Sequence, residues 1–302
     1  KTDYEENVGK YIWKRTKRLL IPAYLWNIFY GGMVAFLGLF GFTIGAKPDL
    51  YNLFVMPFVD GEAFQYNLGS WFVYPLFLVC IINVLFRKFL KLIHLDNEFI
   101  VLIVYLAIGM IGINTALENP TAINGIVKLL VRTMFFLPCY EFGRFYKAVL
   151  EKKDTLNNVA YFAIIFAVQL ILLTFCKDLE YTPSSFTKFN NGFIIPYISS
   201  ITAIAFWLRV SRLLVPAIGN SKLVRLIADN TYGIMVNQLV GFMCLKFVFY
   251  GLSRITSGSL FGDFNVASFK SSIWYYYLPN GLQQWAFLYL IFGLFVPILI
   301  SI

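Results

Sequence analysis

The chain has 302 residues, of which 59% are hydrophobic and 14% are charged, and its net charge is +9. A soluble domain carries roughly 25% charged residues, so this composition, with a mean hydropathy of +0.70, excludes an ordinary soluble protein and indicates an integral membrane protein. The basic residues lie in short loops between apolar segments, as the positive-inside rule expects, and not in a nucleic-acid-binding surface. We therefore expect contact with membrane lipid and no nucleic acid partner.

Cysteine and histidine usage argues against a metal centre. The four cysteines lie in or beside apolar segments without a C-x-x-C pair, so packing explains them. His94 is the only histidine in the sequence, which excludes a histidine-based metal cluster. We expect no metal and no bound cofactor.

Two regions follow one another in the chain: a basic segment over residues 1–18, expected in the cytosol, and an integral membrane domain over residues 19–302. Eight apolar runs of the domain approach the roughly 20 residues that a spanning helix needs. They lie near 19–43, 71–86, 99–117, 126–143, 158–176, 193–210, 231–250 and 284–302. The stretch 51–58 is too short to span and is typical of a re-entrant or interfacial segment. The predicted fold is all-α, a polytopic helical membrane protein with about eight transmembrane helices.

The loop charges predict the orientation. Alternate loops carry 17 lysines and arginines against 6 in the others. By the positive-inside rule, this asymmetry places the N- and C-termini of this chain in the cytoplasm, in a multi-pass protein of the cell membrane. Arg132 and Lys246 remain within the predicted spans.

The stretch "KYIWKRTKRLLIPAYLW", residues 10–26, sets five basic side chains directly before a long apolar run. Arg15 and Arg18 are three positions apart and would share one face of a helix. Two guanidiniums on one face can hold phosphate oxygens bidentately. The alternative is a topology signal that also contacts lipid headgroups.

Two further stretches carry polar residues at or inside the predicted spans. In "NLGSWFVYPLF", residues 67–77, polar residues precede Trp71 at the outer start of a span, and an aromatic-belt role is the alternative. "RTMFFLPCYEFGRFYK", residues 132–147, contains Arg132 and Glu141, and charges inside a span usually face an interior cavity. Alternatively, Arg132 extends outward to the interface and Glu141 lies at the inner interface beside Arg144.

The stretch "IADNTYGIMVNQL", residues 227–239, is the most informative. Asn230 is a good N-cap residue for the helix that follows. Asn237 and Gln238 then lie side by side in an apolar helix, where buried amides mark an interior site or join two helices. The candidate interior polar site therefore comprises Trp71, Arg132, Glu141, Asn230, Asn237 and Gln238.

These four stretches in this order resemble acyltransferase family 3, and most closely its members that acetylate sugars of surface polysaccharides. The resemblance covers essentially the whole chain. It implies that Arg15 and Arg18 match the family's R-x-x-R segment, which faces acyl-CoA on the cytosolic side, and that Lys14 joins them in binding the donor.

The resemblance also implies what these residues lack. Family members carry a catalytic histidine on the first of two helices that precede R-x-x-R, whereas here R-x-x-R opens the chain. We therefore expect the catalytic histidine upstream of this segment, and residues 1–302 alone to be inactive. In many relatives the late motif ends in Asn-His, whereas here Asn237 is followed by Gln238.

The function implied is that of a cell-envelope O-acyltransferase. It would move an acetyl or other short acyl group from cytosolic acyl-CoA, with acetyl-CoA as co-substrate, to a hydroxyl of a glycan or glycolipid. Two alternatives remain open. One is a transporter or flippase of lipid-linked sugars, with the intramembrane polar residues lining its pathway, and the other is a non-catalytic relative of the acyltransferases.

Overall fold

A computed structural model describes residues 6–59, 61–119 and 123–301. Within these residues the chain is helical and forms no strand, and an isolated antiparallel bridge pairs Thr182 with Thr187. The predicted all-α class is confirmed. The chain divides into two compact units. The first comprises Lys1–Leu19, Val59–Gly61 and Phe72–Asn220, and the second comprises Leu20–Phe58, Glu62–Trp71 and Ser221–Ile302.

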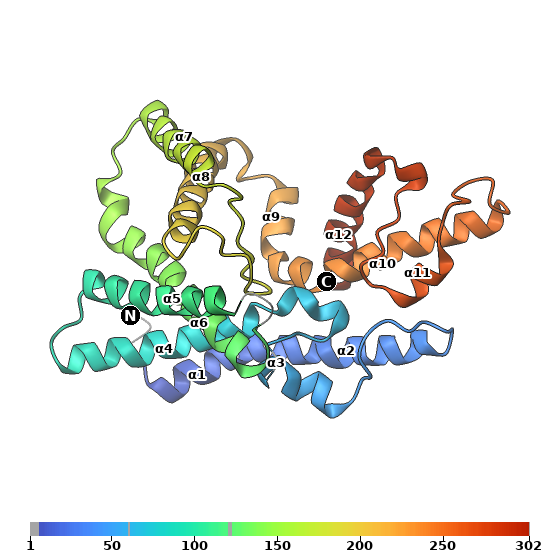
Figure 1. Cartoon of the computed structure of the whole chain (residues 1–302), viewed down its shortest axis with the longest axis horizontal. Coiled ribbons are helices and arrows are strands. Elements are labelled where there is room, and N and C mark those ends of the chain that lie inside the picture. Colours follow the sequence, from blue (N-terminus) through green and yellow to red (C-terminus); the bar gives the residue numbers. More distant parts are fainter. Residues whose placement is uncertain (1–5, 60, 120–122, 302) are drawn as a thin grey trace. The chain divides into compact units, whose positions relative to one another are not determined.

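The first unit contains six labelled helices (Figure 1). They are α1 (Val8–Arg15), α4 (Val73–Leu92), α5 (Glu98–Glu118), α6 (Gly125–Phe145), α7 (Asn158–Phe175) and α8 (Ile195–Ile218). Helix α6 packs against both α4 and α5, α7 packs against α8, and α1 lies on α4. Small residues permit the α5–α6 contact, because a Cβ at Gly112 would stand 3.0 Å from the Met134 Cβ.

The second unit is built around α10. Its helices are α2 (Ile21–Gly38), all but the last residue of α3 (Met56–Val59), α9 (Lys222–Asp229), α10 (Thr231–Ile255), α11 (Val266–Ser271) and α12 (Ala286–Ser301). Glycines allow two other stretches of backbone to approach α10 closely. A Cβ at Gly241 would stand 2.3 Å from the Phe292 carbonyl oxygen of α12, and one at Gly69 would stand 2.0 Å from that of Met235. Gly69 belongs to the 3₁₀ turn Gln65–Ser70, which is thereby seated on α10.

Seven helical segments of the described residues are long and apolar enough to cross a membrane. They are Val8–Gly38, Gln65–Leu92, Glu98–Glu118, Asn158–Phe175, Ile195–Ile218, Thr231–Ile255 and Gln283–Ser301. Each overlaps a predicted span, but the predicted ends at 86 and 210 were too early. Arg87 and Arg209, counted as loop cations, lie on α4 and α8.

The predicted span 126–143 corresponds to α6, which has 21 residues. That length is enough to cross the hydrocarbon core, but every 18-residue window of α6 contains at least three charged residues. Helix α6 is therefore absent from the seven apolar segments, although Arg132 and Glu141 are both buried. Whether α6 crosses decides whether the number of crossings is even, and so whether both termini face one side.

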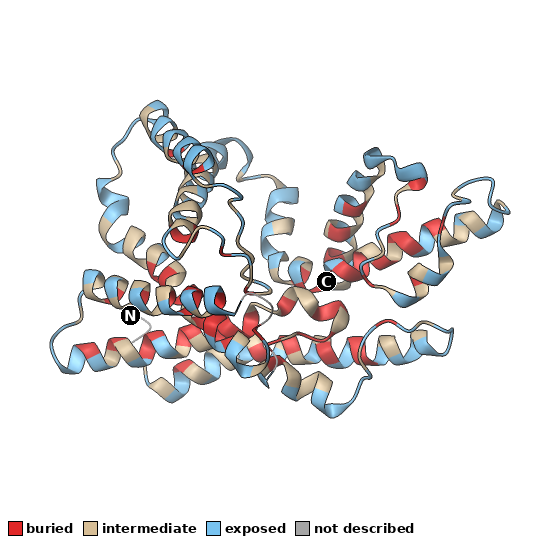
Figure 2. Ribbon diagram, viewed as in Figure 1, coloured by how far each residue is buried: buried red, intermediate tan, exposed pale blue. Residues whose placement is uncertain are grey.

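Helices α7 and α8 expose apolar side chains over most of their surface (Figure 2). Leu170, Phe175 and Trp207 are all largely exposed. A helix that is apolar all round is typical of contact with lipid. The stretch 51–58, by contrast, forms the π turn Tyr51–Val55 and most of the short helix α3. Its backbone is held by α2, where the Asn27 side chain donates to the Leu53 carbonyl over 2.8 Å.

We predict that α6 crosses the membrane. Lys91 and Lys152 then lie on the cytoplasmic side and Ser184 on the outer side, as the positive-inside rule expects. Single cysteines at these exposed positions, in a chain whose four native cysteines are replaced, are labelled in intact cells with a membrane-impermeant thiol reagent. Only Ser184→Cys should react. If Lys152→Cys reacts and Ser184→Cys does not, α6 does not cross and the predicted orientation of the C-terminal half is wrong.

Candidate functional site

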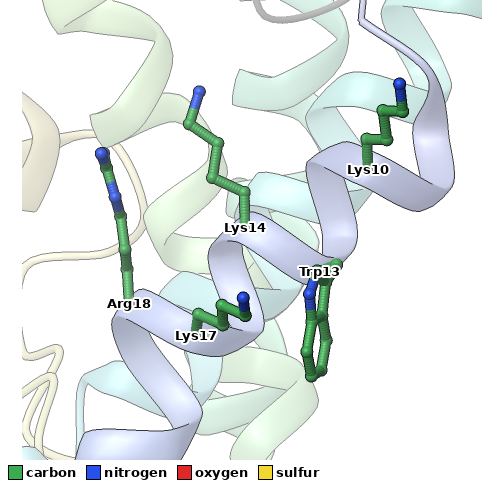
Figure 3. Close-up of a pocket in the computed structure, with 5 residues that line it drawn as sticks. All are labelled: Lys10, Trp13, Lys14, Lys17 and Arg18. Atoms are coloured by element: carbon green, nitrogen blue, oxygen red, sulfur yellow. The ribbon is translucent and has the colours of Figure 1, made fainter.

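A row of cations runs along one face of the helix that opens the chain. Lys10, Lys14 and Arg18 are spaced four residues apart, which places them on one helix face. Figure 3 shows that their side chains leave the helix in the same direction. Together with Trp13 and Lys17 they line an open hollow of ≈ 450 Å³. We call Lys10, Lys14 and Arg18 the cationic row.

The described residues supply little negative charge to this row. The Glu6 carboxylate lies 3.7 Å from the Lys14 ammonium, and both side chains are partly exposed. Such an exposed pair is worth about 0–1 kcal/mol. Lys17 lies over the Trp13 indole, 5.0 Å from the ring centroid. The surface is therefore suited to an anion with several charges and an aromatic part.

Arg15 does not line this hollow. Its guanidinium lies 4.9 Å from the ring centroid of Tyr11, which is fully buried against Cys80 and Val84 of α4. The reason lies in the next turn, Thr16–Leu20, which is a π turn. Its i→i+5 hydrogen bonds put more residues into each turn than an α-helix has. Arg18 therefore shares a helix face with Lys14, four positions before it, better than with Arg15, three positions before it. The structure thus brings Arg18 together with Lys14 and directs Arg15 toward α4.

A buried amide network occupies the second unit. The Asn67 amide nitrogen donates to the Ala23 carbonyl over 3.0 Å and to the Asn27 side-chain oxygen over 2.6 Å. The Ser70 hydroxyl donates to the Asn67 carbonyl over 2.9 Å. These polar groups are buried, and they join the 3₁₀ turn Gln65–Ser70 to α2. Trp71, which follows this turn, is half-buried.

The two adjacent amides of α10 have different surroundings. Asn237 is fully buried and accepts a hydrogen bond from the Tyr30 hydroxyl of α2, while Gln238 is exposed. This burial agrees with the expectation that one amide of the pair faces the bundle interior. The Asn237 amide nitrogen has no acceptor among the residues that the structure describes. It is a buried donor whose orientation is set by Tyr30.

Asn230 takes the N-cap position of α10 without capping it by its side chain. Its amide donates back to the Leu226 carbonyl over 2.8 Å, and the Thr231 hydroxyl donates to the Ala228 carbonyl over 2.9 Å. Both side chains therefore hold the end of α9. The expected capping role is wrong because α9 ends directly before Asn230, so the carbonyl groups at the end of α9 accept the hydrogen bonds of both side chains.

The two charges predicted inside α6 are separated by the structure. Arg132 is buried and donates to the carbonyl oxygen of Gly61, so it does not extend to the surface. Glu141 is buried and pairs with Arg87 of α4 over 2.6 Å. Nine residues apart on one helix, Arg132 and Glu141 contact different partners and form no common site.

An ionic cluster that the sequence did not reveal surrounds Arg87. Its guanidinium is buried and meets three carboxylates: Asp96 at 3.2 Å, Glu98, and Glu141. Arg144 adds a second cation, 3.9 Å from both Glu98 and Glu141. The cluster ties the end of α4 to the start of α5 and the end of α6. A buried glutamate in α6, which needs a cation, was the signal that could have pointed to Arg87.

Two other predicted features are located by the structure. His94 is exposed in the loop between α4 and α5, with a backbone φ of 55°. Lys246 is buried in α10, where its ammonium donates to the Ile273 carbonyl over 3.1 Å. Across the described residues no group of three histidine, cysteine or acidic side chains could hold a metal ion.

Comparison with known proteins gives a match along nearly the whole chain. A family model described as "Acyltransferase domain" matches residues 3–302. No curated protein matches the sequence, and no solved structure matches the fold.

The cluster around Arg87 predicts unequal costs for removing its members. Arg87→Met leaves three carboxylates without their guanidinium and should lower the free energy of unfolding by about 3–5 kcal/mol. Glu141→Gln leaves Arg87 paired with Asp96 and Glu98, and should cost about 1–3 kcal/mol. Unfolding in detergent, followed by helical circular dichroism against denaturant concentration, gives both values.

The exposed residue Lys188 supplies the control, since it pairs at the surface with Glu180. Lys188→Met should change the free energy of unfolding by less than about 1 kcal/mol. A larger cost for Glu141→Gln than for Arg87→Met would contradict the assignment of Arg87 as the centre of the cluster.

Proposed function

This chain belongs to acyltransferase family 3, and on that premise we propose that it is an O-acyltransferase that moves an acetyl or other short acyl group from cytosolic acyl-CoA to a hydroxyl of a glycan or glycolipid. The family match and the apolar helices make it a membrane protein with an acyltransferase domain. The donor, the acceptor, the cell membrane and the cytoplasmic position of both termini are parts of the proposal.

The observation that carries the donor assignment is the cationic row. It stands immediately before the apolar run that begins at Leu19, at the boundary where a water-soluble donor would meet the membrane. Acyl-CoA carries several phosphoryl groups, and cations on one face of a helix bind phosphate oxygens by charge-assisted hydrogen bonds. We keep Arg15 among the proposed donor-binding residues because it matches the family's R-x-x-R segment, although its guanidinium lies over the Tyr11 ring.

The proposed reaction is a direct acyl transfer. The acceptor hydroxyl oxygen attacks the thioester carbonyl carbon, a C–O bond forms, and the C–S bond breaks. The hydroxyl proton passes to a general base and the leaving thiolate takes up a proton to give CoA thiol. The resemblance assigns the base to a histidine on a helix that precedes R-x-x-R in the family's order.

The acceptor is proposed from the loops on the predicted outer side. The segments 176–194 and 256–282 are rich in serine, asparagine and glycine, which suits a sugar. The transporter alternative gains no support, because Arg132 and Glu141 contact separate partners within α6's unit and Gln238 is exposed. No continuous polar pathway is formed by these residues.

We predict that Arg18→Lys raises the KM for acetyl-CoA about tenfold, since a charge-assisted hydrogen bond is worth roughly 1.5–3 kcal/mol and lysine lacks the bidentate fork. Arg15→Lys should have a smaller effect because Arg15 does not line the hollow. Both changes keep the positive charge that orients the chain. The readout is transfer of labelled acetyl groups in membranes that carry the full-length protein.

The matched control is Arg254→Lys, since Arg254 lies over the Tyr250 ring at the end of α10. It should leave the KM unchanged. A KM that does not respond to Arg18→Lys would leave the cations with a topological or lipid-binding role only.

His94 is predicted not to be the base. Because it is exposed in the α4–α5 loop, His94→Ala should leave the transfer rate of the full-length protein unchanged. If His94→Ala stops the transfer, the assignment of the base to a histidine that precedes R-x-x-R fails.

A further inference from the structure

The cationic row has a direction with respect to the membrane. Arg18 adjoins the apolar run that begins at Leu19, whereas Lys10 lies two helical turns further toward the N-terminus. The row therefore extends from the membrane boundary toward the aqueous phase.

The chemical groups of the donor proposed above follow one another in an order that fits the direction of the cationic row. From its reactive end, acyl-CoA consists of the thioester, the pantetheine arm, the 5′-diphosphate and then the 3′-phosphorylated adenosine. If the thioester reaches the acceptor through the membrane domain, the diphosphate passes the boundary next and the nucleoside remains outermost. The diphosphate then meets Arg18 and Lys14, and the 3′-phosphate meets Lys10.

The spacing of the row fits such a ligand. Four residues of helix rise about 6 Å, so three cations in succession cover about 12 Å, on the scale of the three phosphoryl groups of CoA. Lys14 has Glu6 beside it, whereas no ion pair of Lys10 or of Arg18 is formed among the described residues. Both ends of the row therefore lack an ion-pair partner among these residues.

Trp13 lines the same hollow and lies one helical turn from Lys10 along the chain. Its side chain is 55% exposed, and Lys17 lies over the indole. An exposed indole offers a surface on which a base stacks, and stacking of a base on an aromatic ring is sequence-tolerant and favourable in water.

We propose that Lys10 and Trp13 form a subsite for the 3′-phosphoadenosine end of the donor, in which the Lys10 ammonium binds the 3′-phosphate and the Trp13 indole stacks on the adenine. The inference rests on the proposed function. It identifies the feature by which the protein selects CoA thioesters over thioesters of a shorter carrier. A phospholipid headgroup offers the same phosphate chemistry but has no adenine and no 3′-phosphate.

The test compares acetyl-CoA with acetyl-3′-dephospho-CoA as donors for the full-length protein in liposomes. The unmodified protein should prefer acetyl-CoA by about tenfold in kcat/KM, the size expected for one charge-assisted contact. Lys10→Gln should reduce this preference to near one by weakening acetyl-CoA only, and Lys10→Arg should retain it. Trp13→Ala should weaken both donors equally.

Lys153→Gln is the matched control, because it removes one exposed cation from another predicted inner loop and should leave the preference intact. A preference that survives Lys10→Gln overturns the subsite. So does a result in which Lys10→Gln alters only the dependence of the rate on anionic phospholipid, since the row then binds headgroups. If the unmodified protein uses neither donor, the proposed function itself fails, which separates the two conclusions.

Discussion

A charge inside a membrane-spanning bundle must be met by an opposite charge or a carbonyl, because an unpaired buried ion costs several kcal/mol. The first unit is organised by this requirement. Arg87 gathers three carboxylates from the loop before α5, from α5 itself and from α6. These ion pairs hold α4, α5 and α6 in register. Helix α1, which carries Lys10 and Lys14 of the cationic row, packs on the same helix α4 that holds Arg87.

Neutral polar groups obey the same rule in the second unit. The amides of Asn27 and Asn67 hydrogen-bond to each other and to backbone carbonyls, so the irregular turn Gln65–Ser70 is tolerated beside α2. Asn237 and Tyr30 then join α10 to α2. Hydrogen bonds of this kind between spanning helices are worth about 0.6 kcal/mol on average, and here they add to the close backbone contacts that glycine permits. The unit is held by short polar contacts at a few positions and by aromatic packing elsewhere.

The sequence predicted the helical class and the positions of the spans, because long apolar windows leave few other structures in a bilayer. It failed where side-chain direction or helix ends decide the outcome. Arg87 was counted as a loop cation, since a positive residue at the end of an apolar run has the same appearance whether it faces water or a buried Glu141. The separation of Arg15 from Arg18 depends on a π turn, for which local composition gives no signal. Asn237 was expected inside, but its partner Tyr30 is 207 positions away in the chain.

The spacing that places the three cations of the row on one helix face also sets like charges against one another along α1 and the π turn that follows it. Like charges four residues apart destabilise a helix by about 0.2–0.5 kcal/mol per pair, and Lys10, Lys14 and Arg18 form two such pairs. A polyanion that lies along the row converts this repulsion into attraction, so its binding and the helical order of α1 reinforce each other. Occupancy of the row by such an anion would therefore be coupled to the local rigidity of α1 and the π turn that follows it.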